Sequence, residues 1–148
     1  MSQESPRLES KIGYQLKHLQ SLLRAHMDDV LRPLELSIPQ YACLELLQRT
    51  PGASNSDLAR GAFVTRQAMN TLLRGLQDRG LVTRPETVDT GRSRPTTLTP
   101  AGEDLLAQAV VRVEEVEALM VSGLDPQARR RLGEALDRCI DSFEGAKG

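Results

Sequence analysis

The sequence predicts a mainly α-helical protein with one small β-hairpin, in which a winged helix-turn-helix lies between longer N- and C-terminal helices. Three observations lead to this fold class. Residues 54–80 carry the start and stop signals of two short helices. Residues 81–99 contain two short β-prone runs around a basic loop. The flanking segments repeat apolar residues at spacings of three, four and seven, as amphipathic helices do.

The expected helix-turn-helix begins and ends at residues that suit helix termini. Ser54 precedes Asp57 by three positions, so its hydroxyl can accept a hydrogen bond from a free backbone amide of a first helical turn. Gly61–Val64 interrupts that helix, and we expect the glycine to take the positive φ that often ends a helix. Thr65 can cap a second helix that stops at Gly80. In a helix-turn-helix, the second helix lies in a DNA major groove.

The second predicted helix has one apolar and one polar face. Its apolar stripe consists of Ala68, Met69, Leu72, Leu73 and Leu76. The opposite face has arginine, asparagine, glutamine and threonine, which can hydrogen-bond base edges or contact thymine, and no acid before Asp78. An ordinary solvated face would usually mix glutamate with lysine, so this composition favours DNA readout. The residues expected to contact DNA are Ser54, Asn55, Thr65, Arg66, Gln67, Asn70, Thr71, Arg74, Arg92 and Arg94.

The segment after Gly80 predicts the wing. Leu81–Arg84 and Thr96–Thr99 are β-prone, and Asp89–Pro95 between them supplies glycine and proline for a turn and two arginines for its tip. Arginines in such a position can contact phosphates or enter a narrow minor groove. The residues leave open whether Arg92 or Arg94 takes the main minor-groove role.

These motifs together resemble those of the MarR family of bacterial and archaeal transcription regulators. Gly80–Arg84, Asp89 with Gly91–Arg94, and Leu98–Gly102 are similar to its "GLV-x-R … D-x-x-x-R … LT-x-x-G" signature. Leu36–Leu44 resembles the "L-T-x-x-Q-(Y/F)-x-x-L" start of its second helix, and Asn55–Ala59 its "x-x-x-L-A" third helix. The resemblance extends over nearly the whole chain from about Leu8. Thr87 and Thr90 stand where the family wing often has charged residues.

The resemblance implies a small-molecule pocket between the dimerisation helices and the winged helix, one that often takes aromatic acids such as salicylate. By position, the residues that could line it are His18, Leu22, His26, Tyr41 and Leu44. Simple packing in the core is an equally good interpretation of each of them.

Charge is distributed unevenly along the chain. Between Arg60 and Arg94 there are seven arginines and three acids, a local charge of +4, whereas the whole chain carries −1. The rest of the chain therefore carries −5. Attraction to phosphates depends on the local field, so the slightly acidic total does not argue against DNA. No apolar run approaches the ~20 residues of a membrane span, and residues 1–7 are polar and expected to be disordered rather than a signal peptide. We expect a cytoplasmic protein.

The remaining segments predict helices at about 8–31, 38–49 and 100–122, and a last helix from Asp125–Pro126 onward. The stripe of the last helix is Ala128, Leu132, Ala135, Leu136, Cys139, Ile140 and Phe143. These terminal helices have more apolar surface than a winged-helix domain can cover. We therefore expect residues 8–34 and 100–148 to form a dimerisation region around a DNA-binding domain at 35–99, and the operator to be an imperfect palindrome.

Catalytic and metal-binding signals are weak. His18 and His26 lie eight positions apart and miss the i, i+4 spacing of a helical metal pair, and no nucleophile or phosphate-binding loop is evident. We expect neither an enzyme nor a cofactor or metal site. Cys43 could be a peroxide-sensing thiol as in some MarR relatives, but its apolar mid-helix context favours an inert side chain.

The sequence therefore predicts a dimeric, sequence-specific DNA-binding regulator, expected to be a repressor that a small aromatic acid releases. Two alternatives remain. One is a winged helix that binds a protein partner without an operator, and the other is a thiol-based redox-sensing regulator acting through Cys43. Four arginines (Arg66, Arg74, Arg92 and Arg94) in one arc favour DNA over a protein partner.

Overall fold

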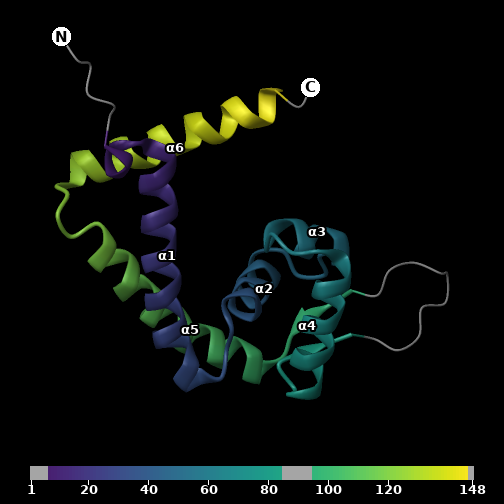
Figure 1. Cartoon of the computed structure of the whole chain (residues 1–148). Helices are drawn as coiled ribbons and strands as arrows, with labels where there is room; N and C mark the ends of the chain where they lie inside the picture. The colour runs from purple at the N-terminus through teal and green to yellow at the C-terminus, as the bar shows by residue number, and fades with distance from the viewer. Residues whose placement is uncertain (1–6, 85–94, 147–148) are drawn as a thin grey trace, which may run out of the picture. The chain divides into compact units, whose positions relative to one another are not determined.

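The computed structural model describes residues 7–84 and 95–146, which are mainly helical with one small antiparallel sheet (Figure 1). This confirms the predicted fold class. The elements in chain order are η1 (Leu8–Ser10), α1 (Ile12–Leu31), η2 (Arg32–Leu34), α2 (Ile38–Arg49), α3 (Asn55–Gly61), α4 (Arg66–Asp78), β1 (Val82–Thr83), β2 (Thr97–Leu98), α5 (Pro100–Met120) and α6 (Pro126–Ala146). None of these helices is long and apolar enough to cross a membrane.

The chain divides into two compact units, Met1–Glu114 and Glu115–Gly148, so the boundary falls inside α5. In the first unit α1 packs against α2, beside the helix-turn-helix. The predicted grouping of residues 8–34 with 100–148 follows their expected role in dimerisation and stays a prediction. The expected disordered N-terminus lies outside the described residues except for Arg7.

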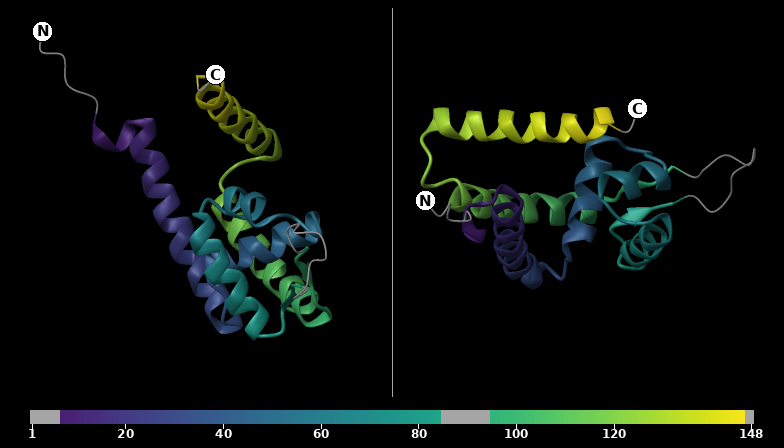
Figure 2. Two further views of the ribbon diagram at one scale, coloured as in Figure 1. Left: turned by 90° about the vertical axis from the view of Figure 1, so that its right-hand side faces the viewer. Right: turned by 45° about the horizontal axis from the view of Figure 1, so that its top comes forward.

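The core of the first unit is built mainly from aliphatic side chains, with Met69, Tyr41 and Cys43, and draws on α1 to α5 and the segments between them. The largest of its fully buried members are Leu31, Leu44, Leu47, Leu58, Met69, Leu73, Leu76 and Leu106. The packing of α3 against α4 that encloses part of this core can be followed in Figure 2. Ala68 was assigned to the apolar stripe of α4 but is exposed. The buried stripe is centred on Met69, Leu73 and Leu76, and Ala68 lies about 100° away from Met69 around the helix.

Side-chain caps fix where three helices of the first unit begin. Ser37 and Gln40 form a reciprocal capping box at α2, with N···O distances of 2.8 and 3.2 Å. Ser54 Oγ accepts from the backbone N–H of Asp57 at 3.1 Å, and Thr65 Oγ1 accepts from that of Ala68 at 3.0 Å. The caps predicted for α3 and α4 are thus confirmed. These two bonds set the first turn of each helix of the helix-turn-helix.

The turn between α3 and α4 differs from the expectation. The positive φ belongs to Phe63, at 59°, and Gly61 is the last residue of α3. A Cβ on Gly61 would lie 2.9 Å from a terminal methyl carbon of Leu46, so this glycine permits the close approach of α3 to α2. Phe63 is also 95% exposed. Such a φ is uncommon for a bulky residue.

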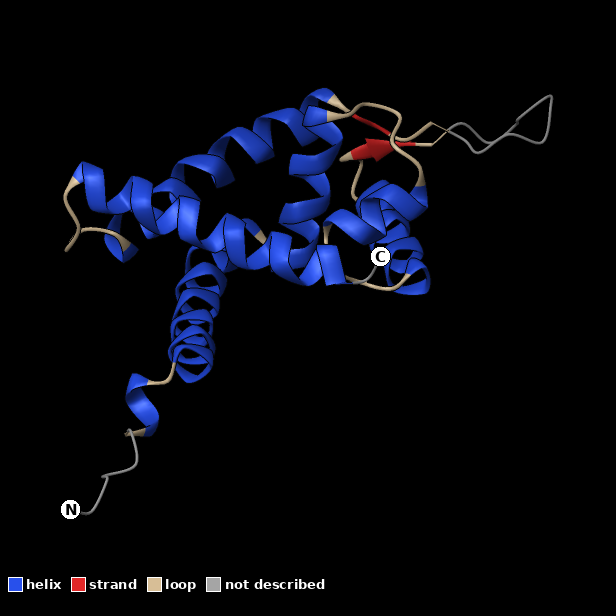
Figure 3. Cartoon of the chain, turned by 90° about the horizontal axis from the view of Figure 1, so that it is seen from above, coloured by secondary structure: helices blue, strands red, loops and turns tan. Residues whose placement is uncertain are grey.

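The hairpin is antiparallel, with Val82 opposite Leu98 and Thr83 opposite Thr97, and Figure 3 shows its strands side by side. Each strand has two residues, fewer than the runs 81–84 and 96–99 expected from sequence. The hydroxyls of Thr83 and Thr97 are hydrogen-bonded at 3.0 Å. The tip of the expected wing lies outside the described residues.

Thr99 joins the end of α4 to the start of α5. Its hydroxyl donates to the carbonyl of Gly80 at 2.6 Å and accepts from the backbone N–H of Gly102 at 3.0 Å. Its own backbone N–H donates to the carbonyl of Leu81 at 3.0 Å. Gly102 lies directly against the backbone of Leu81. The Leu98–Gly102 motif therefore has a structural role, because its hydrogen bonds and close packing fix the hairpin and the start of α5 against the end of α4.

In the second unit, Asp125 caps α6 by accepting from the backbone N–H of Ala128 at 2.8 Å. The apolar stripe of α6 is exposed: the exposed fractions are 41% for Leu136, 52% for Ile140 and 80% for Phe143. No side chain of α6 is buried. The stripe predicted from periodicity is thus present and uncovered in the single chain.

Candidate nucleic-acid interface and effector groove

The polar face of α4 is presented to solvent as the sequence indicates. Arg66, Gln67, Asn70, Thr71 and Arg74 are all exposed. In the part of the chain that the structure describes, neither Arg66 nor Arg74 forms a salt bridge. Their guanidinium groups are therefore available to phosphates or to the acceptor edge of guanine.

Ser54 and Thr65 cap helices in addition to their expected role in contacting DNA. Each uses a lone pair of its hydroxyl oxygen for its helix cap, which leaves the hydroxyl proton available to a phosphate oxygen. Thr71 donates its hydroxyl proton to the carbonyl of Gln67 at 3.2 Å. DNA contacts by these residues stay a prediction. The same holds for Arg92 and Arg94, which lie outside the described residues.

Asn55 and Asn70 form a polar bridge between α3 and α4. Asn55 Nδ2 donates to Asn70 Oδ1 at 3.1 Å and lies 3.5 Å from the carbonyl oxygen of Arg66. Asn55 is half-buried, whereas Asn70 is exposed. The two residues are 15 positions apart, so no local pattern in the sequence indicates their contact.

Arg79 belongs to the basic segment by sequence, and its exposed side chain is hydrogen-bonded to the backbone between α1 and α2. Its guanidinium donates to the backbone carbonyls of Glu35 at 2.6 Å and Leu34 at 3.4 Å. Glu35 has a φ of 56° and ends η2, so the arginine fixes an unusual turn between α1 and α2. Arg79 adds positive charge near α4 but serves as a clamp on this turn.

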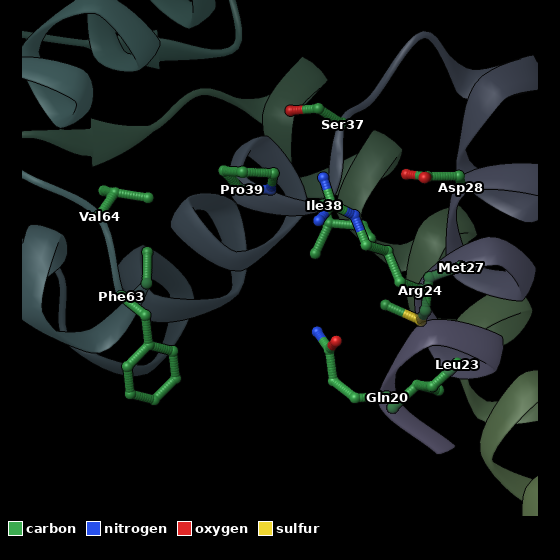
Figure 4. Close-up of a pocket in the computed structure, with 11 residues that line it drawn as sticks. Gln20, Leu23, Arg24, Met27, Asp28, Ser37, Ile38, Pro39, Phe63 and Val64 are labelled. Atoms are coloured by element: carbon green, nitrogen blue, oxygen red, sulfur yellow. The ribbon is translucent and has the colours of Figure 1, made fainter. Parts of the chain in front are cut away.

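An open groove of about 480 Å³ lies between α1, the start of α2 and the α3–α4 turn. Figure 4 shows Gln20, Leu23, Arg24, Met27 and Asp28 of α1 facing Phe63 and Val64. Ser37, Ile38 and Pro39 at the start of α2, together with Ala62, complete the lining. The groove combines apolar walls with one guanidinium and one carboxylate on the same helix.

None of the five residues suggested for a ligand pocket lines this groove. Tyr41 and Leu44 are buried in the core of the first unit. His18, Leu22 and His26 are exposed on α1, and the rings of His18 and Tyr14 lie 6.4 Å apart. Gln20, Arg24 and Met27 recur at spacings of four and three, so they share a face of α1.

Cys43 is fully buried in α2, and burial raises the pKa of its thiol to about 12. At pH 8 only about one such thiol in ten thousand is ionised, and the thiolate is the reactive form. The structure therefore supports the inert interpretation of Cys43. Cys139, on α6, is exposed.

We expect Cys43 to resist thiol reagents in the folded protein. In a Cys139→Ser variant at pH 8, Ellman's reagent should titrate no thiol until denaturant is added, and one thiol afterwards. Rapid labelling of the folded variant, with its circular dichroism unchanged, would contradict this expectation and revive the redox-sensing alternative.

Comparison with known proteins places this architecture in a family. Residues 34–93 match the MarR family. The chain is 39% identical over 130 residues to the HTH-type transcriptional repressor Rv2887 of Mycobacterium tuberculosis, covering 88% of this chain and 94% of that protein.

Solved structures agree with this match. Rv2887 in complex with salicylic acid has a TM-score of 0.72 and 39% identity, over 88% of this chain and 96% of the other. Rv2887 in complex with DNA has a TM-score of 0.75 and 36% identity, over 88% of this chain and 98% of the other. With its capped helix-turn-helix, its hairpin and this extent of similarity, the chain belongs to the MarR family of helix-turn-helix transcriptional regulators and is not an enzyme.

Proposed function

We propose that this regulator is a homodimeric repressor that binds a pseudo-palindromic operator, with one α4 in each of two successive major grooves. The observation that carries the proposal is the polar face of α4, which is exposed and has two arginines outside any salt bridge of the described residues. The similar Rv2887 is named a repressor and has a structure in complex with DNA, which supports repression and DNA binding by this regulator.

Exposed apolar side chains support the dimer. In the first unit Ile12, Leu16, Leu19 and Leu22 of α1 are 41–71% exposed, and in the second unit Leu132, Leu136, Ile140 and Phe143 of α6 are 37–80% exposed. A soluble monomer rarely leaves such continuous apolar stripes in water. A second copy of the same chain offers matching stripes and the two-fold symmetry of a palindromic operator.

Replacing Arg74 with alanine should lower affinity for the specific operator about 5- to 150-fold, because a paired contact between arginine and guanine contributes roughly 1–3 kcal/mol of discrimination. The measurement is a gel shift with DNA from upstream of the protein's own gene, at several salt concentrations. Arg32→Ala is the matched control, since it removes another exposed arginine, which pairs with Asp29 on the surface. Unchanged affinity in the Arg74 variant, with the dimer intact, would count against readout by this face of α4.

We further propose that the groove at Arg24 receives a small aromatic carboxylate that releases the operator. The apolar side chains of Leu23, Met27 and Ile38 suit an aromatic ring, and the Arg24 guanidinium suits a carboxylate. The carboxylate of Asp28 also lines the groove and disfavours anions, so binding depends on the Arg24 charge. Rv2887 in complex with salicylic acid supports this class of effector.

Such a ligand can act on DNA binding through the elements that it touches. The groove joins α1 to the turn that precedes α4, so a ligand in it can favour a conformation in which the two recognition helices no longer match successive grooves. The ligand releases the operator only to the extent that it binds that conformation more tightly than the conformation that binds DNA.

Arg24→Ala should weaken salicylate binding and operator release at least tenfold, while affinity for the operator without ligand changes little. Titration calorimetry and gel shifts with high micromolar to millimolar salicylate provide the two readouts. His26→Ala is the matched comparison, because His26 is on the same helix but outside the groove. If His26→Ala weakens the response to salicylate and Arg24→Ala does not, the effector binds at the site expected from sequence. If calorimetry detects no heat of salicylate binding to the unmodified protein, the effector belongs to another class of molecule.

A further inference from the structure

We propose that Asp28 is a specificity-determining residue of the effector groove, and that it selects aromatic carboxylates with a hydrogen-bond donor, such as an amino group, at the meta or para position of the ring. This inference rests on the proposed function of the groove at Arg24. It adds the second functional group that the effector carries and the side chain that recognises this group.

Asp28 brings a carboxylate without a cationic partner to the groove. It is half-buried on α1 and lines the groove together with Arg24. Figure 4 shows the Asp28 carboxylate and the Arg24 guanidinium both directed from α1 into the groove. Neither side chain takes part in a salt bridge within the described part of the chain. Arg32, which lines a neighbouring concavity with Asp28, pairs with Asp29 at 3.4 Å. The Asp28 carboxylate is therefore open to a donor that enters the groove.

The order of the two charges along α1 is the less favourable one for a salt bridge between them. Arg24 and Asp28 are four positions apart, which places them on the same face of the helix. An acid that precedes a base by four positions forms the more stable pair, and here the base precedes the acid. A ligand can therefore engage both groups without first breaking a salt bridge between them.

A substituted aromatic ring suits this layout. Its carboxylate pairs with the Arg24 guanidinium, and the half-buried side chains of Leu23, Met27 and Ile38 provide apolar contact for the ring. The Cβ atoms of residues four apart on a helix are about 5–6 Å from each other. A meta or para donor lies across the ring from the carboxylate, so it can reach Asp28 while the carboxylate stays at Arg24. The ortho hydroxyl of salicylate instead lies beside the ligand's own carboxylate and hydrogen-bonds to it.

Asp28 acts on selectivity in two ways. A ring without a donor removes water from the Asp28 carboxylate and does not replace the lost hydrogen bonds, which is unfavourable. The ligand carboxylate and Asp28 also repel each other, and a plain ring offers nothing that offsets this repulsion. An N–H group on the ring instead forms a charge-assisted hydrogen bond with Asp28. A site that pairs with a donor discriminates against analogues that lack the donor.

The test compares benzoate with 3-aminobenzoate and 4-aminobenzoate, each of which adds one donor group, by titration calorimetry on the full-length protein. We expect at least one aminobenzoate to bind about tenfold more tightly than benzoate, the lower end of what a hydrogen bond to a charged group contributes. Operator release in gel shifts should follow the same order. Aminobenzoates that bind no more tightly than benzoate would overturn the inference.

Asp28→Ala separates recognition of the donor from structural support and from charge repulsion alone. The variant should bind benzoate more tightly than the wild type does, because the repulsion is gone. The ratio of aminobenzoate affinity to benzoate affinity should fall close to one. A structural role alone would weaken binding of these acids alike, and repulsion alone would have weakened it alike in the wild type, so both leave the ratio unchanged.

Asp29→Ala is the matched control and should keep the wild-type ratio. Asp29 is the neighbouring acid on α1, is exposed and lies outside the groove. A ratio that survives Asp28→Ala, or that Asp29→Ala abolishes as well, would overturn the inference.

Failure of the proposed effector site and failure of this inference give different results. If neither salicylate nor any of the three benzoates produces heat, the proposed effector class and this inference fail together. If salicylate binding depends on Arg24 but the aminobenzoates bind no more tightly than benzoate, only the inference fails.

Discussion

Replacing Leu136 with glutamate is expected to convert the proposed dimer into monomers and to lower operator affinity at least about a hundredfold. Leu136 lies within the exposed apolar stripe of α6, and a carboxylate buried there without a partner would be strongly unfavourable. A monomer holds only one half-site, so it loses the avidity of roughly 10²–10⁴ that linked binding provides. Sedimentation equilibrium and gel shifts measure the two effects.

Gln127→Glu is the control for this experiment. It introduces the same charge on α6 at an exposed position about 140° around the helix from the centre of the stripe, so assembly should be unaffected. Truncation before Asp125 is a second route to the same result, because it removes the whole stripe. A well-behaved truncated dimer, or a Leu136→Glu dimer with full affinity, would locate the subunit interface elsewhere.

Gly102→Ala is expected to lower the free energy of unfolding of the first unit by about 3 kcal/mol or more, by overpacking. A Cβ at this position would collide with the backbone carbonyl of Leu81, which cannot move aside as a side chain can. The collision would push α5 away from Thr99, whose hydroxyl accepts from the Gly102 N–H. Urea denaturation followed by circular dichroism gives the change in stability.

Gly75→Ala is the matched control, since it also replaces a helical glycine of the same unit. Nothing lies within 4 Å of a Cβ there, so the substitution should stabilise α4 by about 0.5–1 kcal/mol through its better helix propensity. Equal effects of the two substitutions would mean that the contact between Gly102 and Leu81 does not constrain the fold.

The sequence by itself determined the elements whose causes are local. Caps at Ser54 and Thr65 act within one turn, and the positive φ of 74° at Gly80 follows the end of α4 as its glycine indicates. The periodicity of α4 also correctly separates the apolar stripe from the polar face, apart from Ala68. Helix capping and amphipathicity depend on residues three or four positions apart, so they can be read along the chain.

Only the tertiary structure decided the features that join distant segments. Phe63 rather than Gly61 takes the left-handed conformation, and Gly61 lies against Leu46 of another helix. The groove at Arg24, the clamp of Arg79 on the turn at Glu35 and the bridge from Asn55 to Asn70 each join residues that lie far apart in the sequence. Contacts of this kind depend on how helices pack in space, and no periodicity along a single chain records which side chain will meet which.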